Sequence, residues 1–128
     1  MPTQSEFEVI HVDNHLLVVN KPAGMLSQGD STGDRSLVDH AQDWLVNTYN
    51  KPGKAFVGLV HRLDRPVGGV MVLARTSKGA ARLSEQFRER RVEKVYWAVV
   101  NGIPSPAQQS LEQTLDDKAC RLEFRTLR

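Results

Sequence analysis

A charged tetrad at residues 61–64 has the composition of a catalytic loop. His61, Arg62, Leu63 and Asp64 follow an apolar run and precede a Pro and two Gly residues. Proline and glycine shape tight loops and let a ligand approach the backbone closely. A nearby cation favours the ionised form of a carboxyl group, so Arg62 and Arg65 would keep Asp64 charged. The pattern therefore indicates either a carboxylate nucleophile or a turn held by an Asp–Arg pair.

The elements that position this tetrad follow from the spacing of apolar residues. Strand-forming residues dominate five runs, at residues 7–12, 16–20, 56–63, 70–74 and 95–100. Helical spacing marks residues 37–48, after the N-cap candidate Ser36, and 77–91, after Thr76 or Ser77. We predict an α+β fold, with a mixed, mainly antiparallel sheet and flanking helices, in a single domain over residues 1–128.

The end of the chain alternates apolar and polar residues like a strand, from Cys120 to Leu127. A strand needs a hydrogen-bonded neighbour, so we expect the sheet to continue beyond Arg128 and the domain to be truncated at its C-terminal end. Cys120 itself is expected to be a small, buried apolar residue.

The composition is that of an ordinary globular protein. Of 128 residues, 40% are hydrophobic and 25% are charged, and the formal net charge is +2. No apolar run approaches the roughly 20 residues of a membrane span, and the first residues lack a signal-peptide pattern. A single cysteine cannot form an internal disulfide. We therefore expect a cytoplasmic protein that does not bind membranes.

Basic residues are concentrated between Arg75 and Lys94, where seven Lys and Arg stand against three Glu. Such an excess can contact RNA phosphates, or it can be a solvated helix face with charge pairs one turn apart. The four histidines show no metal-ligand spacing, so we predict neither a metal nor a cofactor.

Three blocks of the sequence resemble the RluA-type family of RNA pseudouridine synthases, in the order that this family has them. "VVNKPAGML" at 18–26 is similar to an Asn-Lys-Pro-x-Gly block, "HRLD" at 61–64 to the segment of the catalytic Asp, and "KVYWAVVNG" at 94–102 to the block whose Tyr faces the target uracil. The resemblance covers residues 7 to about 102. It implies a pseudouridine synthase-like catalytic domain that isomerises uridine to pseudouridine in tRNA or rRNA.

On that resemblance, Asp64 is the nucleophile and Tyr96 stacks on the target base, while attack on C1′ and attack on C6 both remain open. The partner is a structured RNA, and the implied chemistry needs no metal or redox cofactor. The expected substrate and RNA-binding residues are Arg62, His61, Lys21, Arg65, Lys78, Arg82, Arg91 and Lys94. The chain departs from the family in having Val67-Gly68-Gly69 where Thr-Ser-Gly is usual, and in lacking a later Gly-Arg-x-His-Gln-Ile-Arg segment.

Two other functions fit parts of the pattern. The first is a catalytically incomplete fragment that binds RNA weakly through the basic helix, or pairs an exposed sheet edge with a second copy. The second is an Asp-dependent glycosidase, which generally needs a second carboxylate. The other candidates, Asp13, Asp30, Asp34 and Asp39, lie in segments that suggest no such pairing.

Overall fold

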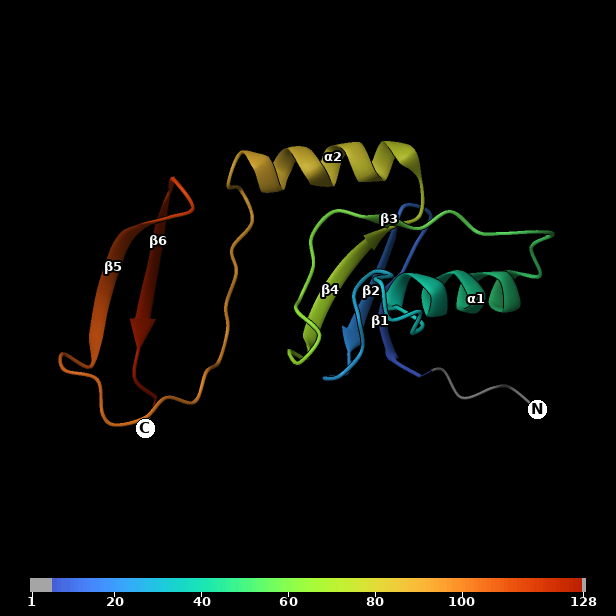
Figure 1. Cartoon of the computed structure of the whole chain (residues 1–128). Coiled ribbons are helices and arrows are strands. Elements are labelled where there is room, and N and C mark those ends of the chain that lie inside the picture. The colour runs from blue at the N-terminus through green and yellow to red at the C-terminus, as the bar shows by residue number, and fades with distance from the viewer. Residues whose placement is uncertain (1–5, 128) are drawn as a thin grey trace. The chain divides into compact units, whose positions relative to one another are not determined.

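The computed structural model describes residues 6–127 and separates the chain into two compact units, one up to Glu93 and one from Lys94 (Figure 1). The elements of the first unit are β1 (Glu8–Val12), β2 (Leu16–Lys21), α1 (Leu37–Tyr49), β3 (Gly58–Leu59), β4 (Gly69–Ala74) and α2 (Ser77–Arg88). Those of the second are β5 (Gln108–Leu115) and β6 (Lys118–Arg125). The α+β class with antiparallel sheets is confirmed, and the single domain over 1–128 stays a prediction.

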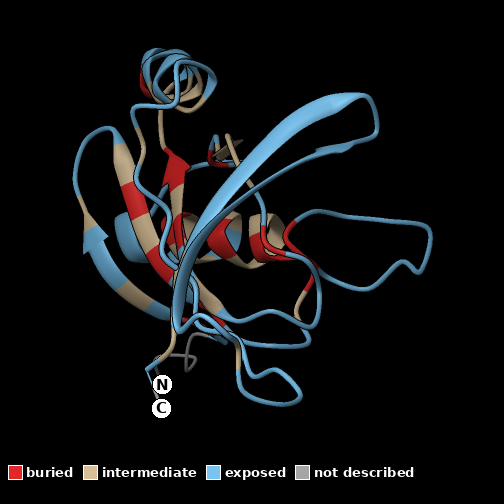
Figure 2. Ribbon diagram, turned by 90° about the vertical axis from the view of Figure 1, so that its left-hand side faces the viewer, coloured by how far each residue is buried: buried red, intermediate tan, exposed pale blue. Residues whose placement is uncertain are grey.

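The first unit is a four-stranded antiparallel sheet in the order β1-β2-β4-β3, with its core on one face. Alternation along β2 and β4 buries Leu17 opposite Leu73 and Val19 opposite Met71. Helix α1 covers these side chains with Leu37, Ala41 and Leu45. Full burial of each large aliphatic side chain stabilises the fold by about 1.5–3 kcal/mol. The buried positions of Figure 2 accordingly gather on β2, β4 and α1.

Both helices begin where the sequence predicts. Ser36 and Asp39 form a reciprocal capping box at the start of α1, with the Asp39 amide 3.3 Å from Ser36 Oγ and the Ser36 amide 2.9 Å from Asp39 Oδ2. The Thr76 hydroxyl accepts from the Gly79 amide at 3.0 Å and caps α2. Such caps are each worth about 0.5–2 kcal/mol. Helix α1 ends at Tyr49, and its C-cap residue Asn50 adopts the left-handed conformation.

One strand prediction was wrong, and two predicted elements are shorter than expected. Only Gly58 and Leu59 of residues 56–63 pair with β4, because the chain then leaves the sheet edge. Residues 95–100 form no strand, since no neighbour within the described part of the chain supplies hydrogen bonds to them. Val95, Trp97 and Val99 are exposed by 75%, 85% and 103%. Helix α2 ends at Arg88, one turn before residue 91.

The second unit contains a β-hairpin, β5–β6, with one apolar face. Register pairs Leu111 with Leu122 and Gln109 with Phe124, so these side chains share a face with Leu115 and Cys120. The strand expected at the chain end is therefore confirmed as β6. The prediction that Cys120 is buried was wrong, because Cys120 is exposed on this hairpin, whose described residues are exposed almost throughout (Figure 2).

No helix within residues 6–127 is long and apolar enough to cross a lipid bilayer.

Candidate active site around Asp64

Asp64 lies on the loop that leads into β4, with its side chain exposed and its backbone fixed. The preceding Leu63 is buried, and its amide and carbonyl both bond to the hydroxyl of buried Ser27, at 3.1 and 2.5 Å. The Asp64 carbonyl accepts from the amide of Val67 at 2.9 Å, which closes a turn. An exposed carboxylate on a fixed loop is the arrangement that a nucleophile requires.

Lys21 lies beneath this loop and is fully buried. Its ammonium donates to the carbonyls of Met25 at 2.6 Å, and of Pro22 and Arg65 at 3.3 Å each. Burial lowers the pKa of Lys21, and the negative charge of Asp64 opposes that effect. Lys21 therefore joins the 22–25 loop to the Asp64 loop from inside the protein. An RNA-binding residue was expected to have an exposed side chain, whereas that of Lys21 is buried.

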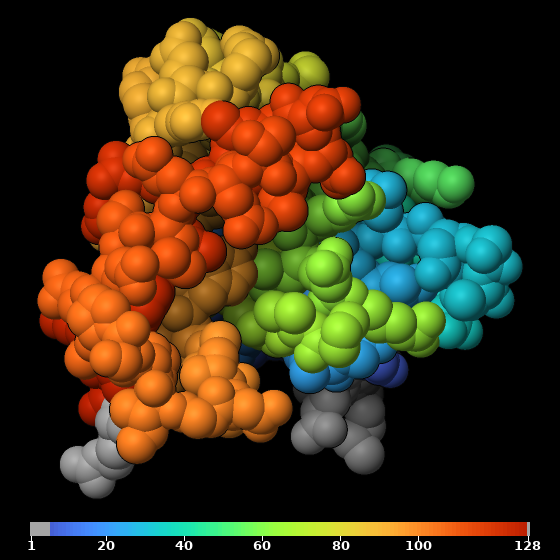
Figure 3. All heavy atoms as spheres, turned by 60° about the vertical axis from the view of Figure 1, so that its left-hand side comes forward, coloured from blue at the N-terminus to red at the C-terminus, as the bar shows by residue number. Residues whose placement is uncertain are grey.

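Arg65 connects the Asp64 loop to residues 24–34, a segment that follows β2 in the chain. Its Nε donates to the Gly24 carbonyl at 3.0 Å, its Nη2 pairs with Asp34 at 2.7 Å, and its carbonyl accepts from the Gly24 amide at 2.8 Å. Figure 3 shows the two segments side by side at the surface, yellow-green against blue and cyan. Among the described residues no cation forms an ion pair with Asp64, so neither Arg65 nor the exposed Arg62 makes the expected Asp–Arg pair.

His61 lies between β4 and α2. Its Nε2 accepts from the Val72 amide at 3.0 Å, and its ring stacks on Phe87 with centroids 4.8 Å apart. His61 attaches the start of the tetrad to both elements that follow it.

Gly68 was not among the site residues named from the sequence, although the glycines after Asp64 were expected to let a ligand or another backbone come close, and the loop does depend on its small size. A Cβ at this position would lie 3.1 Å from the Ala23 amide nitrogen and 3.2 Å from the Lys21 carbonyl oxygen. The Gly68 backbone thus packs directly on the segment that carries Lys21. Ser27 and Asp34 were missed as well, because a single Ser or Asp in a polar loop carries no distinctive pattern.

The remaining predicted residues lie elsewhere. Lys78 and Arg82 lie on α2 and line a hollow with the β1–β2 turn. Arg91 pairs with Glu89 at 2.8 Å and with Glu85 at 3.9 Å, the charge pairing of a solvated helix end. Lys94 and Tyr96 belong to the second unit, where both are exposed. Within residues 6–127 no group of three or more His, Cys, Asp or Glu side chains could hold a metal ion.

Comparison with known proteins shows which family this chain resembles. Residues 15–126 match a family model described as RNA pseudouridylate synthase. The chain is 37% identical over 118 residues to the mitochondrial pseudouridylate synthase RPUSD4 of Xenopus tropicalis, covering 87% of this chain and 34% of that protein. It is 39% identical over 98 residues to tRNA pseudouridine synthase C of Haemophilus ducreyi, covering 76% and 38%.

A solved structure, human RNA pseudouridylate synthase domain containing 4, matches with a TM-score of 0.72 at 27% identity. The match covers 90% of this chain and 47% of that one. The chain thus spans between a third and a half of the length of these proteins.

Proposed function

Because the chain belongs to the RNA pseudouridylate synthase family, we propose that it supplies the nucleophile of an enzyme that converts uridine to pseudouridine in RNA, and that Asp64 is that nucleophile. The observation that carries the proposal is the exposed Asp64 carboxylate on a loop fixed through Ser27, Lys21 and Arg65. Loop residues held this firmly need little reorganisation before they react.

The reaction needs a carboxylate that can attack and later leave. Asp64 would form a covalent bond to the uridine, at C1′ of the ribose or at C6 of the uracil, and the glycosidic bond would break. After the base has turned, its C5 bonds to C1′ and the carboxylate is released. The C5 proton is then lost and N1 takes up a proton, so the product is an isomer of the substrate. No described cation is paired with Asp64, so its oxygens are open to a substrate.

We propose a structured tRNA or rRNA as substrate. Relatives are named for both, as tRNA pseudouridine synthase C and as ribosomal large subunit pseudouridine synthases C and D. The target base must leave its stack, which costs a few kcal/mol, and the exposed ring of Tyr96 would offset part of this cost by stacking. Arg62, exposed beside Asp64, would contact the backbone of the displaced nucleotide. A cytoplasmic location stays a prediction.

The test is to incubate the chain with unmodified tRNA and rRNA transcripts and to map pseudouridine by carbodiimide-dependent primer stops. Asp64→Asn keeps the shape of the side chain and should abolish the stops. Asp116→Asn is the matched control, because Asp116 is exposed in the β5–β6 turn at φ +50°, which asparagine tolerates. It should leave the stops unchanged.

Stops that persist in Asp64→Asn would refute the assignment of the nucleophile. RNA binding without any stop would favour the alternative of a catalytically incomplete fragment and would refute the activity of this chain.

A further inference from the structure

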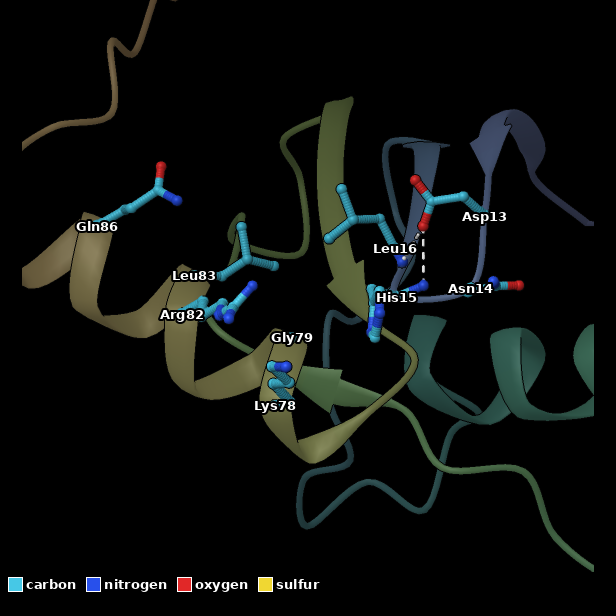
Figure 4. Close-up of a pocket in the computed structure, with 9 residues that line it drawn as sticks. All are labelled: Asp13, Asn14, His15, Leu16, Lys78, Gly79, Arg82, Leu83 and Gln86. Carbon is cyan, nitrogen blue, oxygen red and sulfur yellow. Dashed lines mark hydrogen bonds between the residues drawn. The ribbon is translucent and has the colours of Figure 1, made fainter.

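A hollow of about 430 Å³ lies at the end of β2 away from Lys21, between α2 and the β1–β2 turn (Figure 4). Lys78, Arg82 and Leu83 line it from α2, and Asp13, His15 and Leu16 from the turn. Strand β2 runs from Leu16 to Lys21, so five steps of about 3.3 Å place the two ends roughly 16 Å apart. The hollow is therefore separate from the Asp64 loop.

Short contacts hold the walls of the hollow together. A Cβ on Gly79 would lie 3.0 Å from the His15 carbonyl, so the first turn of α2 packs directly on the turn between the strands. His15 Nδ1 and Thr76 Oγ1 are hydrogen-bonded at 2.9 Å, and the Arg75 amide donates to the His15 carbonyl at 2.8 Å. The hollow is thus formed before any ligand arrives, which reduces the entropy lost on binding.

The acidic and basic side chains around the hollow differ in how far they are already bonded within the protein. The Asp13 carboxylate accepts from the amides of His15 and Leu16, at 2.8 and 2.7 Å, and from His11 Nε2 at 2.9 Å. In Figure 4 it is turned toward these amides. Lys78 and Arg82, one helical turn apart and exposed, form no ion pair with any residue that the structure describes. The α2 side therefore presents two cations with no internal counter-charge.

The interior of the hollow adds an apolar surface. Leu16 and Leu83 line it and are each half-buried, which leaves part of both side chains open to a ligand. Cations beside an apolar surface match the two parts of a nucleotide, an anionic phosphate and a base with apolar faces. An acidic peptide would use the cations but would leave the leucine surface uncovered.

We infer that this hollow binds a second nucleotide of the substrate RNA, away from the target uridine. Its phosphate would lie at Lys78 and Arg82, and its base or ribose over Leu16 and Leu83. The inference rests on the proposed function for the identity of the ligand as RNA. It gives α2 the task of holding the RNA strand while Asp64 acts on another position.

The experiment compares two double variants that remove equal charge. Lys78→Gln/Arg82→Gln changes the hollow, and Lys51→Gln/Lys54→Gln changes an exposed loop after α1. The affinity for a fluorescent RNA stem-loop is measured by anisotropy from about 50 to about 300 mM salt. We expect the hollow variant to bind about five- to tenfold more weakly at low salt, with a salt slope shallower by about 0.7–1. The control pair should retain both values.

A second readout locates the ligand. The amide signals of His15 and Gly79 in ¹H–¹⁵N spectra should shift on addition of uridine monophosphate at lower concentrations than on addition of inorganic phosphate. Equal RNA binding by both double variants would overturn the inference, and so would an acidic peptide that shifts these signals at lower concentration than the nucleotide.

Failure of this inference can be told apart from failure of the proposed function. Asp64→Asn should keep the wild-type salt slope even when it forms no pseudouridine. If the two double variants had the same salt slope while the primer stops persisted, the inference of a second nucleotide site would be refuted. The proposed function would then still stand.

Discussion

Replacing Lys21 by methionine tests whether one buried ammonium holds the loop that carries Asp64. Methionine has a similar length but donates no hydrogen bond. Two of the three carbonyls retain a backbone donor, since the Met25 amide lies 3.4 Å from the Pro22 oxygen and the Gly24 amide 2.8 Å from the Arg65 oxygen. The Met25 oxygen, 2.6 Å from Lys21 Nζ, loses the one donor that residues 6–127 provide.

The expected loss of stability follows from these contacts. A carbonyl left without a donor inside the protein costs about 1–3 kcal/mol, and each of the two longer bonds contributes at most about 0.5–1 kcal/mol. Removing a charged group from the interior gives part of this back, because burial disfavours the ammonium. We therefore expect the free energy of unfolding to fall by about 1–3 kcal/mol.

The assay is urea denaturation followed by the fluorescence of Trp44, which packs against the core of the first unit. Trp97 is 85% exposed in the second unit and would add a separate signal, so all variants carry Trp97→Phe. Lys54→Met, at an exposed position, is the matched control and should change stability by less than about 0.5 kcal/mol. Equal midpoints for Lys21→Met and Lys54→Met would refute the reasoning.

The pH dependence gives a second check of Lys21. Its pKa in the folded chain lies below the usual 10.5, so the unfolded chain binds more protons in the window between the two values. Stability therefore rises with pH across that window. The free energy of unfolding of the unsubstituted chain, minus that of Lys21→Met, should increase as the pH approaches 10.5. A difference that stays constant or falls would contradict the burial of the charged group.

Two further predictions concern the loop and the β1–β2 turn. Gly68→Ala should destabilise the chain by about 1–3 kcal/mol and reduce primer stops, because its Cβ would meet the Ala23 and Lys21 backbone at 3.1–3.2 Å. Gly29→Ala, whose Cβ would meet nothing within 4 Å, should be neutral. Hydrogen bonds from His11 and from the amides of His15 and Leu16 lower the pKa of Asp13 to about 2 from 3.8. The stability it adds, relative to Asp13→Asn, should be constant above about pH 5 and vanish as the pH falls from about 4 to about 2.

These predictions fail under clear conditions. Equal urea midpoints for Gly68→Ala and Gly29→Ala would show that the loop has room for a methyl group. A stability difference between the unsubstituted chain and Asp13→Asn that persists below about pH 2 would show that the carboxylate charge is not what stabilises the turn.

Local signals in the sequence were sufficient for much of the first unit. Ser36 and Thr76 were identified as caps because a hydroxyl before a helical pattern satisfies the first free amides, whatever the rest of the fold does. Strands β2 and β4 were found because alternating or continuous apolar residues must be buried somewhere. These signals depend only on neighbours in the chain.

What the sequence could not predict depends on partners far along the chain. Residues 95–100 have strong strand propensity, but a strand exists only where another strand pairs with it. From the sequence alone, Lys21 is expected to be an exposed cation. In the fold its ammonium donates to the carbonyl of Arg65, which is 44 residues away in the chain. Arg65 itself was expected beside Asp64, and a choice among Asp64, Asp34 and Gly24 cannot be made from spacing alone.

The hydrogen bond between the Val72 amide and His61 also has a consequence for the outer edge of β4. Strand β3 pairs only with Leu73 and Ala74, so the outer edge of β4 continues past the end of its neighbour. An open edge of this kind can recruit a strand from another molecule. The imidazole of His61 occupies the amide of Val72 at that edge, and Phe87 holds the ring in place. Within residues 6–127, a side chain thus occupies this amide at the edge of β4, which opposes the addition of a strand from a second molecule at this position.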